Sequence, residues 1–125
     1  MPDGIRIMVV DDTEHVRKML VTMLDLDGFA VVGDYGSGEE AVAEVEGADP
    51  DVIVIDYKMP AMDGLETARR IRARRPDQAV ILYTAFVDDA LEAEARKVGV
   101  AVCLGKVEGL GSLEREITRL CGSLF

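Results

Sequence analysis

The sequence predicts an α/β fold, a single doubly wound (βα)5 domain over residues 1–125 in which five parallel strands alternate with five helices. Short runs rich in Val and Ile recur about every 25 residues, and each is followed by apolar residues at helical spacing. The runs are apolar on both faces, which is typical of parallel strands covered by helices on each side. The length suits one domain.

Three strands and two helices are predicted in the first half of the chain. A strand at Ile5–Val10 precedes a helix that ends at Gly28. The predicted buried face of this helix comprises Val16, Met19, Leu20, Met23 and Leu24. A second strand is expected at Phe29–Gly33, and Ser37 is predicted to cap a short helix. Its buried side would hold Ala41, Val42 and Val45. The third strand lies in Asp51–Pro60, DVIVIDYKMP, and runs directly into an acid.

The second half contributes three helices and two strands. A helix is predicted from about Leu65 to Arg75, and a strand follows at Ala79–Thr84. Asp88 is expected to open a helix that ends near Gly99, before a fifth strand at Ala101–Leu104. The last amphipathic helix is marked by Leu110, Leu113, Ile117, Leu120 and Leu124.

The alternation of strands and helices also predicts the order of the strands. Right-handed crossovers are the common way to join parallel strands, and the flavodoxin-like order 2-1-3-4-5 places strands one and three side by side at the switch point. Ligands of such sheets bind outside the carboxyl ends of the strands.

Acids stand at two of these strand ends. Asp11 and Asp12 follow the first strand and Asp56 follows the third, so three carboxylates are expected at one edge of the sheet. Their mutual repulsion favours either protonation of one acid or binding of a cation. Oxygen ligands suit a hard divalent ion, and Mg²⁺ shares its remaining positions with water and phosphate oxygens. The sequence therefore predicts a magnesium site that accepts a phosphoryl group.

Thr84 and Lys106 fall at the same edge, after the fourth and fifth strands. The hydroxyl can donate a hydrogen bond to a phosphoryl oxygen, and the ammonium can neutralise its charge. Asp56 could then act as a carboxylate nucleophile that forms an acyl phosphate by in-line transfer.

Almost the whole chain resembles the receiver domain of two-component response regulators. The resemblance is carried by strand-end residues and short motifs in order, namely Asp11, Asp12, Met59-Pro60 after Asp56, Asp63-Gly64, Thr84-Ala85 and Lys106. It implies that Asp56 accepts phosphate from a sensor histidine kinase or a phosphotransfer protein. It also implies that Asp12 and Asp56 bind Mg²⁺ directly, that Asp11 helps through water, and that the carbonyl of Lys58 completes the site.

The same resemblance implies a switch rather than an enzyme with an external substrate. The chain would catalyse only the phosphorylation of its own Asp56 and the loss of that group. Phosphorylation would change the face formed by the fourth helix, the fifth strand and the fifth helix. A downstream protein or effector domain would read this face, and a phosphorylation-dependent homodimer is a further expectation.

The chain departs from the family pattern near Lys106. The family usually has an aromatic residue three positions before the lysine, which turns inward when the threonine moves, and here Cys103 stands there. Output could instead involve Tyr83 or Phe86. Phe86, two residues after Thr84, is also placed to limit the approach of water to the acyl phosphate. The lysine is often followed by proline, whereas here Val107 follows it.

Composition excludes several classes of partner. The formal charge of −10 opposes attraction to nucleic acid and anionic membranes. Five arginines within residues 69–75 are interpreted as a solvated helix face balanced by acids, and His15 as a surface residue. With no signal peptide and no apolar run of about 18 residues, the setting is predicted to be cytoplasmic, and Cys103 and Cys121 to be reduced hydrophobic side chains.

Three other functions were weighed against these residues. A magnesium-dependent phosphatase with an aspartate nucleophile would, by resemblance, need a second Asp at the position of Lys58. A flavin-binding module is disfavoured because the acidic loop after the first strand would repel a phosphate. A degenerate receiver that signals without phosphorylation is the third alternative, motivated by Cys103.

Overall fold

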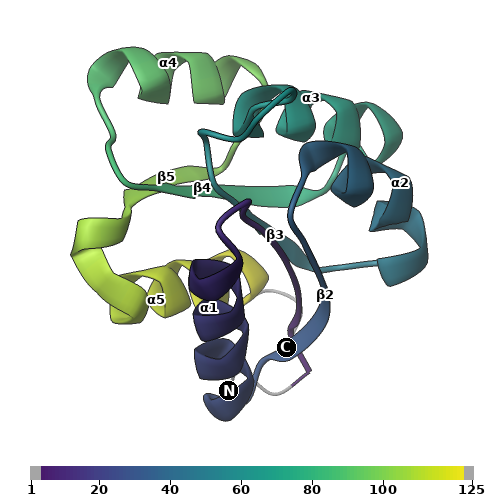
Figure 1. Cartoon of the computed structure of the whole chain (residues 1–125), viewed down its shortest axis with the longest axis vertical. Helices are drawn as coiled ribbons and strands as arrows, with labels where there is room; N and C mark the ends of the chain where they lie inside the picture. The colour runs from purple at the N-terminus through teal and green to yellow at the C-terminus, as the bar shows by residue number, and fades with distance from the viewer. Residues whose placement is uncertain (1–3, 123–125) are drawn as a thin grey trace.

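Five parallel strands form one sheet in the computed structural model, which describes residues 4–122. The strand order is β2-β1-β3-β4-β5, so the predicted doubly wound topology is confirmed (Figure 1). The elements are β1 (Arg6–Val10), α1 (Glu14–Leu26), β2 (Ala30–Tyr35), α2 (Gly38–Ala48), β3 (Val52–Ile55), α3 (Gly64–Arg74), β4 (Ala79–Thr84), α4 (Asp89–Lys97), β5 (Val102–Gly105), a 3₁₀ turn η1 (Lys106–Glu108) and α5 (Gly109–Cys121).

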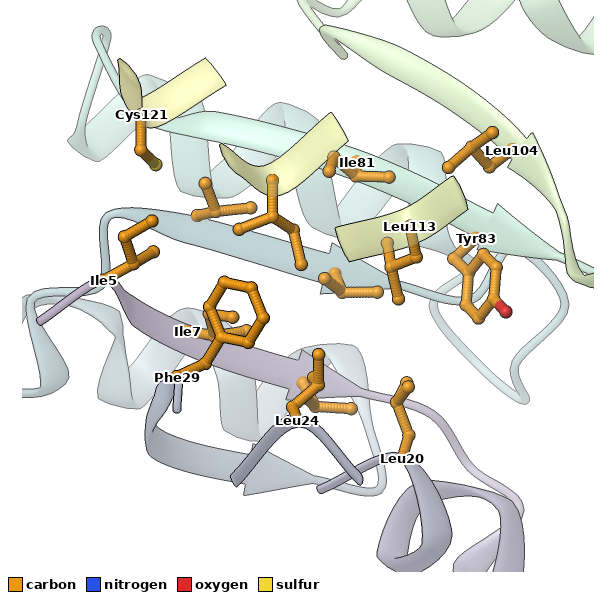
Figure 2. Packing of buried hydrophobic residues seen from close by; sticks show 14 residues of the cluster. Ile5, Ile7, Leu20, Leu24, Phe29, Ile81, Tyr83, Leu104, Leu113 and Cys121 are labelled. Carbon is orange, nitrogen blue, oxygen red and sulfur yellow. The ribbon is translucent and has the colours of Figure 1, made fainter. Parts of the chain in front are cut away.

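The helices cover the two faces of the sheet unequally. Helices α1 and α5 lie on one face, and α2, α3 and α4 lie on the other (Figure 1). Successive residues of β3 alternate between the two apolar clusters that result, with Val52 and Val54 in one and Ile53 and Ile55 in the other. Figure 2 shows the cluster beneath α1 and α5. Burial on both faces explains the continuous apolar run of this central strand.

Three helices begin with the side-chain caps that their sequences supply. Ser37 accepts a hydrogen bond from the amide of Glu40, which confirms the predicted cap of α2. Asp63 and Asp88 cap α3 and α4 in the same way. Gly28 follows α1 with a φ of 98°, a left-handed conformation that suits glycine at a helix end.

The predicted buried face of α1 is too wide. Leu20 and Leu24 are buried, but Met19 is 61% exposed and Met23 is 41% exposed. Each methionine lies about 100° around the helix from the leucine that follows it. The sheet and α5 cover only the leucine side, so the prediction for both methionines is wrong.

Smaller differences concern the ends of elements. Strand β2 continues to Tyr35 instead of ending at Gly33, because its backbone keeps pairing with β1 as far as Val10. In α5, Leu113 and Ile117 are buried as predicted. Leu124, also predicted on that face, lies outside the described residues.

The arginine-rich helix face is balanced by acids, as predicted. Arg69 and Arg70 both pair with Glu66, and Arg74 pairs with Glu46 across to α2. His15 is exposed on α1. Both cysteines are free thiols. Within residues 4–122, no helix combines the length and the apolar character that crossing a membrane requires.

Candidate functional site

Three carboxylates meet where β1 and β3 end. The two strands are hydrogen-bonded neighbours, with Val10 opposite Ile55. The next residues therefore come together, and the amide of Asp56 donates to the carbonyl of Val10 at 2.9 Å. One carboxylate oxygen from each of Asp11, Asp12 and Asp56 lies within 4.8 Å of the others. The predicted acidic cluster is thus present.

The three acids differ in exposure and in bonding. Asp11 is only 2% exposed; its Oδ1 accepts from the Thr13 amide at 2.9 Å, and its Oδ2 accepts from the Lys106 ammonium at 2.9 Å. Asp56 is half-buried and its Oδ1 accepts from the Tyr57 amide at 2.8 Å. Asp12 is exposed. Asp11 is therefore already held by the protein, whereas Asp12 is open to solvent.

Lys106 and Thr84 complete the edge from the other side of β3. Thr84 is the last residue of β4, is buried, and pairs in register with Gly105 of β5. Lys106 follows directly, and its Nζ lies 3.6 Å from Oδ2 of Asp56. The structure therefore brings together all five side chains that the sequence placed at strand ends.

The electrostatics of Asp56 reflect this crowding. Burial raises the pKa of Asp56, the Thr84 hydroxyl and the Lys106 ammonium lower it, and the Asp11 carboxylate raises it; the net shift is upward. Burial lowers the pKa of Lys106, but the bonds and charges of Asp11 and Asp56 raise it more, so the lysine stays protonated. Three carboxylates against one ammonium leave an excess of negative charge at the edge.

This donor set fits a hard divalent cation. Carboxylate oxygens within 4.8 Å of one another can share one ion, and the excess charge of the cluster equals that of a divalent cation. Lys58 lies in the exposed loop after Asp56. In the described part of the chain its carbonyl accepts no backbone hydrogen bond, which leaves that oxygen free to act as a ligand.

Gly64 packs closely against the backbone of Asp56 and Tyr57. A Cβ atom at this first residue of α3 would lie 2.3 Å from the Asp56 carbonyl oxygen, and the Gly64 amide donates to the Tyr57 carbonyl at 2.7 Å. Only glycine permits this approach. The sequence marked Gly64 as a chain break and part of a motif, and nothing in its local pattern indicated this contact.

A side cavity of about 480 Å³ opens beside Asp56 towards α4. Its walls include Thr84 and the apolar side chains of Leu65, Phe86 and Leu91. Phe86 is 72% exposed at the rim. The predicted position of Phe86 beside the site is confirmed.

Cys103 does not belong to the acidic site. It lies on β5, half-buried, and packs against the cluster on the side of α2, α3 and α4. Burial raises the pKa of the Cys103 thiol, which keeps it protonated. The thiol lines a small cavity with Arg96 and Arg119 near the surface between α4 and α5.

Comparison with known proteins agrees with this geometry. The family model of the response regulator receiver domain matches residues 7–118. The response regulator GacA of Pseudomonas viridiflava is 37% identical over 114 residues, an alignment that covers 90% of this chain and 53% of GacA. The transcriptional regulatory protein PdtaR of Mycobacterium tuberculosis is 35% identical over 129 residues, covering 95% of this chain and 62% of PdtaR. The chain thus spans little more than half the length of these relatives.

Solved structures show the same fold. A two-component response regulator of the LuxR family from Aurantimonas sp. superposes with a TM-score of 0.88 at 28% identity, covering 94% of this chain and 85% of the other.

Proposed function

Because this chain belongs to the response regulator receiver domain family, we propose that Asp56 is its phosphoacceptor and that phosphorylation switches its interactions. Phosphorylation-dependent switching is the general role of the family. One observation carries the assignment of the residue: Asp56 is the half-buried carboxylate that stands between two further acids and the ammonium of Lys106.

The residues of this edge have distinct roles in phosphoryl transfer. A carboxylate oxygen of Asp56 attacks the phosphorus of a phosphorylated histidine, and an acyl phosphate forms as the phosphorus–nitrogen bond breaks. Asp11, Asp12, Asp56 and the Lys58 carbonyl would hold Mg²⁺, which offsets charge on the phosphoryl oxygens when bound. Lys106 binds a phosphoryl oxygen as a point charge, and the Thr84 hydroxyl donates to another.

This chemistry needs a phosphoryl donor, and the signal needs a partner that recognises the phosphorylated form. The donor is a sensor histidine kinase or a phosphotransfer protein in the cytoplasm. The recognising partner is a downstream protein or an effector domain. A phosphorylation-dependent homodimer is one form that the response could take. The chain itself turns over no external substrate: it phosphorylates and dephosphorylates its own Asp56.

Labelling with a small phosphodonor tests the proposal. Incubated with acetyl phosphate and Mg²⁺, the wild type should gain the mass of one phosphoryl group, and Asp56→Asn should gain none. Asp51→Asn is a matched control, because Asp51 flanks the opposite end of β3 and bonds to the Arg6 amide. It should be labelled like the wild type.

Two results would contradict the proposal. Full labelling of Asp56→Asn would place the phosphoryl group elsewhere. No labelling of the wild type would favour a receiver that signals without phosphorylation.

Omission of Mg²⁺ should abolish labelling, and labelling that persists in a chelator would overturn the metal assignment.

A further inference from the structure

Tyr83 connects the acidic edge to the opposite face of the sheet. It is the residue before Thr84 on β4, so the two side chains point to different faces. Thr84 stands at the acidic site, whereas Tyr83 enters the cluster beneath α1 and α5. Any movement of the end of β4 therefore moves groups on both faces.

The ring of Tyr83 packs against α5. It is 8% exposed, lies opposite Leu104 of β5, and shares a cluster with Leu113 in the second turn of α5. Figure 2 shows the ring beside Leu113, with its oxygen directed away from the other labelled side chains. A displacement of this rigid ring is transmitted to α5 because close-packed side chains leave no room for it to be absorbed.

The hydroxyl of Tyr83 lies near the turn that precedes α5. Burial raises the pKa of Tyr83, the Lys106 charge lowers it and the Glu108 charge raises it, so both ends of η1 act on this group. Glu108 also accepts a hydrogen bond from the Gly105 amide at 3.2 Å, which closes the turn. Lys106 is thus at once the cation of the acidic site and the first residue of η1.

The turn lies beside two glycines and has open space around it. Gly109, between η1 and α5, has a φ of 86°, and Gly111 follows in the first turn of the helix, where a Cβ would meet nothing within 4 Å. Val107, at the middle of η1, is 90% exposed. On the other face of the sheet, Cys103 of β5 packs against the cluster that includes Leu91 and Ala95 of α4, but it has no rigid ring.

We propose that Tyr83 couples phosphorylation of Asp56 to a rearrangement of η1 and the first turn of α5, so that the surface around Val107 reports the phosphorylated state. This inference rests on the proposed function. A phosphoryl group on Asp56 draws the Lys106 ammonium away from Asp11 and the Thr84 hydroxyl towards its oxygens. The backbone of η1 follows Lys106, and the Tyr83 ring follows the end of β4 and shifts Leu113.

Hydrogen exchange measured by mass spectrometry tests the coupling in the whole chain. With acetyl phosphate and Mg²⁺, the wild type should show a several-fold change of exchange rate over residues 106–113. Tyr83→Leu should be labelled on Asp56 to the same extent and lose this change, whereas Tyr83→Phe, which keeps the ring, should retain it. Tyr35→Leu is the matched control, a half-buried tyrosine of β2 on the other face, and should respond like the wild type.

Fluorescence gives a second readout that does not depend on the Leu variant folding. The chain has three tyrosines and no tryptophan, so Tyr35→Phe with Tyr57→Phe leaves Tyr83 as the only emitter. Its emission should change when phosphodonor is added after Mg²⁺.

Three results would each overturn this inference alone. They are a labelled wild type whose hydrogen exchange changes only in α4, a full exchange response in Tyr83→Leu, and constant Tyr83 emission. No labelling at all would overturn the proposed function as well.

Discussion

At the scale of the residue, Asp56 is held in a state that favours chemistry over stability. Burial and the neighbouring Asp11 carboxylate raise its pKa, so its ionised form is less stable in the folded protein than in water. An acid whose pKa is raised on folding contributes stability below its unfolded pKa, and this contribution is lost as the pH rises through the folded pKa. At neutral pH the ionised Asp56 therefore destabilises the fold.

Replacing this charge should stabilise the protein. Asp56→Asn keeps the size of the side chain and removes one of three clustered carboxylates, so at pH 7 the free energy of unfolding should rise. Urea denaturation at pH 7 measures it. The gain should shrink as the pH is lowered from 7 to 4, because a growing share of the wild-type carboxyl is then protonated. A constant gain across this range would show that charge is not its origin.

Phe86 should set the lifetime of the acyl phosphate. It forms the rim of the cavity beside Asp56, and its ring can screen the phosphoryl group from water. Phe86→Ala should hasten dephosphorylation several-fold without changing the site of labelling. Decay of the phosphorylated mass after removal of phosphodonor provides the measurement. Val107→Ala, which changes another exposed apolar residue that does not line the cavity, is the control; equal decay of Phe86→Ala and wild type would exclude screening.

At the scale of the element, α1 and α5 are joined by two acids as well as by apolar packing. Asp27 caps the end of α1, and Glu114 on α5 lines the same surface hollow. In the described part of the chain, Oε2 of Glu114 is a buried oxygen without a hydrogen-bond partner. Burial, together with the neighbouring Asp27 carboxyl, raises the pKa of Glu114 to about 7. Below about pH 7 the Glu114 carboxyl is therefore protonated, which avoids leaving a charge on this buried oxygen.

The contact between these helices should weaken as the pH rises. The pKa of Glu114 lies near 4.5 in the unfolded chain and at about 7 in the fold, so its contribution to stability is complete below about 4.5 and is lost through about 7. Glu114→Gln should show a smaller loss of stability between pH 5 and 8 than the wild type. Urea midpoints at both pH values measure this difference, with Glu44→Gln, an exposed acid of α2, as control. Parallel curves for wild type and Glu114→Gln would disprove it.

At the scale of the whole molecule, the chain carries a net charge of −10, and three of its acids gather at one edge of the sheet. The edge is assembled from β1, β3, β4 and the turn after β5, which are distant in the sequence. A cation bound there would link the segments that follow β1 and β3. Binding should therefore be visible as global stability, because a ligand of the folded state alone shifts the unfolding equilibrium.

Mg²⁺ should raise the melting temperature of the wild type. At about 100 times the dissociation constant, the stabilisation is about 2.7 kcal/mol. Differential scanning calorimetry in MgCl₂, compared with NaCl at equal ionic strength, separates site binding from screening. Asp12→Asn should reduce the shift, since Asp12 is the exposed acid of the cluster and our proposed ligand. An equal rise in both salts would show that only screening acts.

The sequence by itself determined the elements, their order in the sheet and the membership of the acidic site. These follow from local patterns: apolar runs set the strands, and parallel strands bring their carboxyl ends to one edge, so Asp11, Asp12, Asp56, Thr84 and Lys106 had to meet. Only the tertiary structure decided which of the helix residues are covered. Met19 and Met23 follow the helical pattern and yet stay exposed, because coverage depends on where a neighbouring element lies.

The tertiary structure also decided the contacts between segments distant in the chain. Gly64 against the Asp56 carbonyl, Glu114 beside Asp27 and the Tyr83 ring against Leu113 have no signature in spacing or composition. Spacing records which side of its own strand or helix a residue occupies. The distance to a residue on another element depends on sheet twist and helix packing, which the chain as a whole sets only when it is folded.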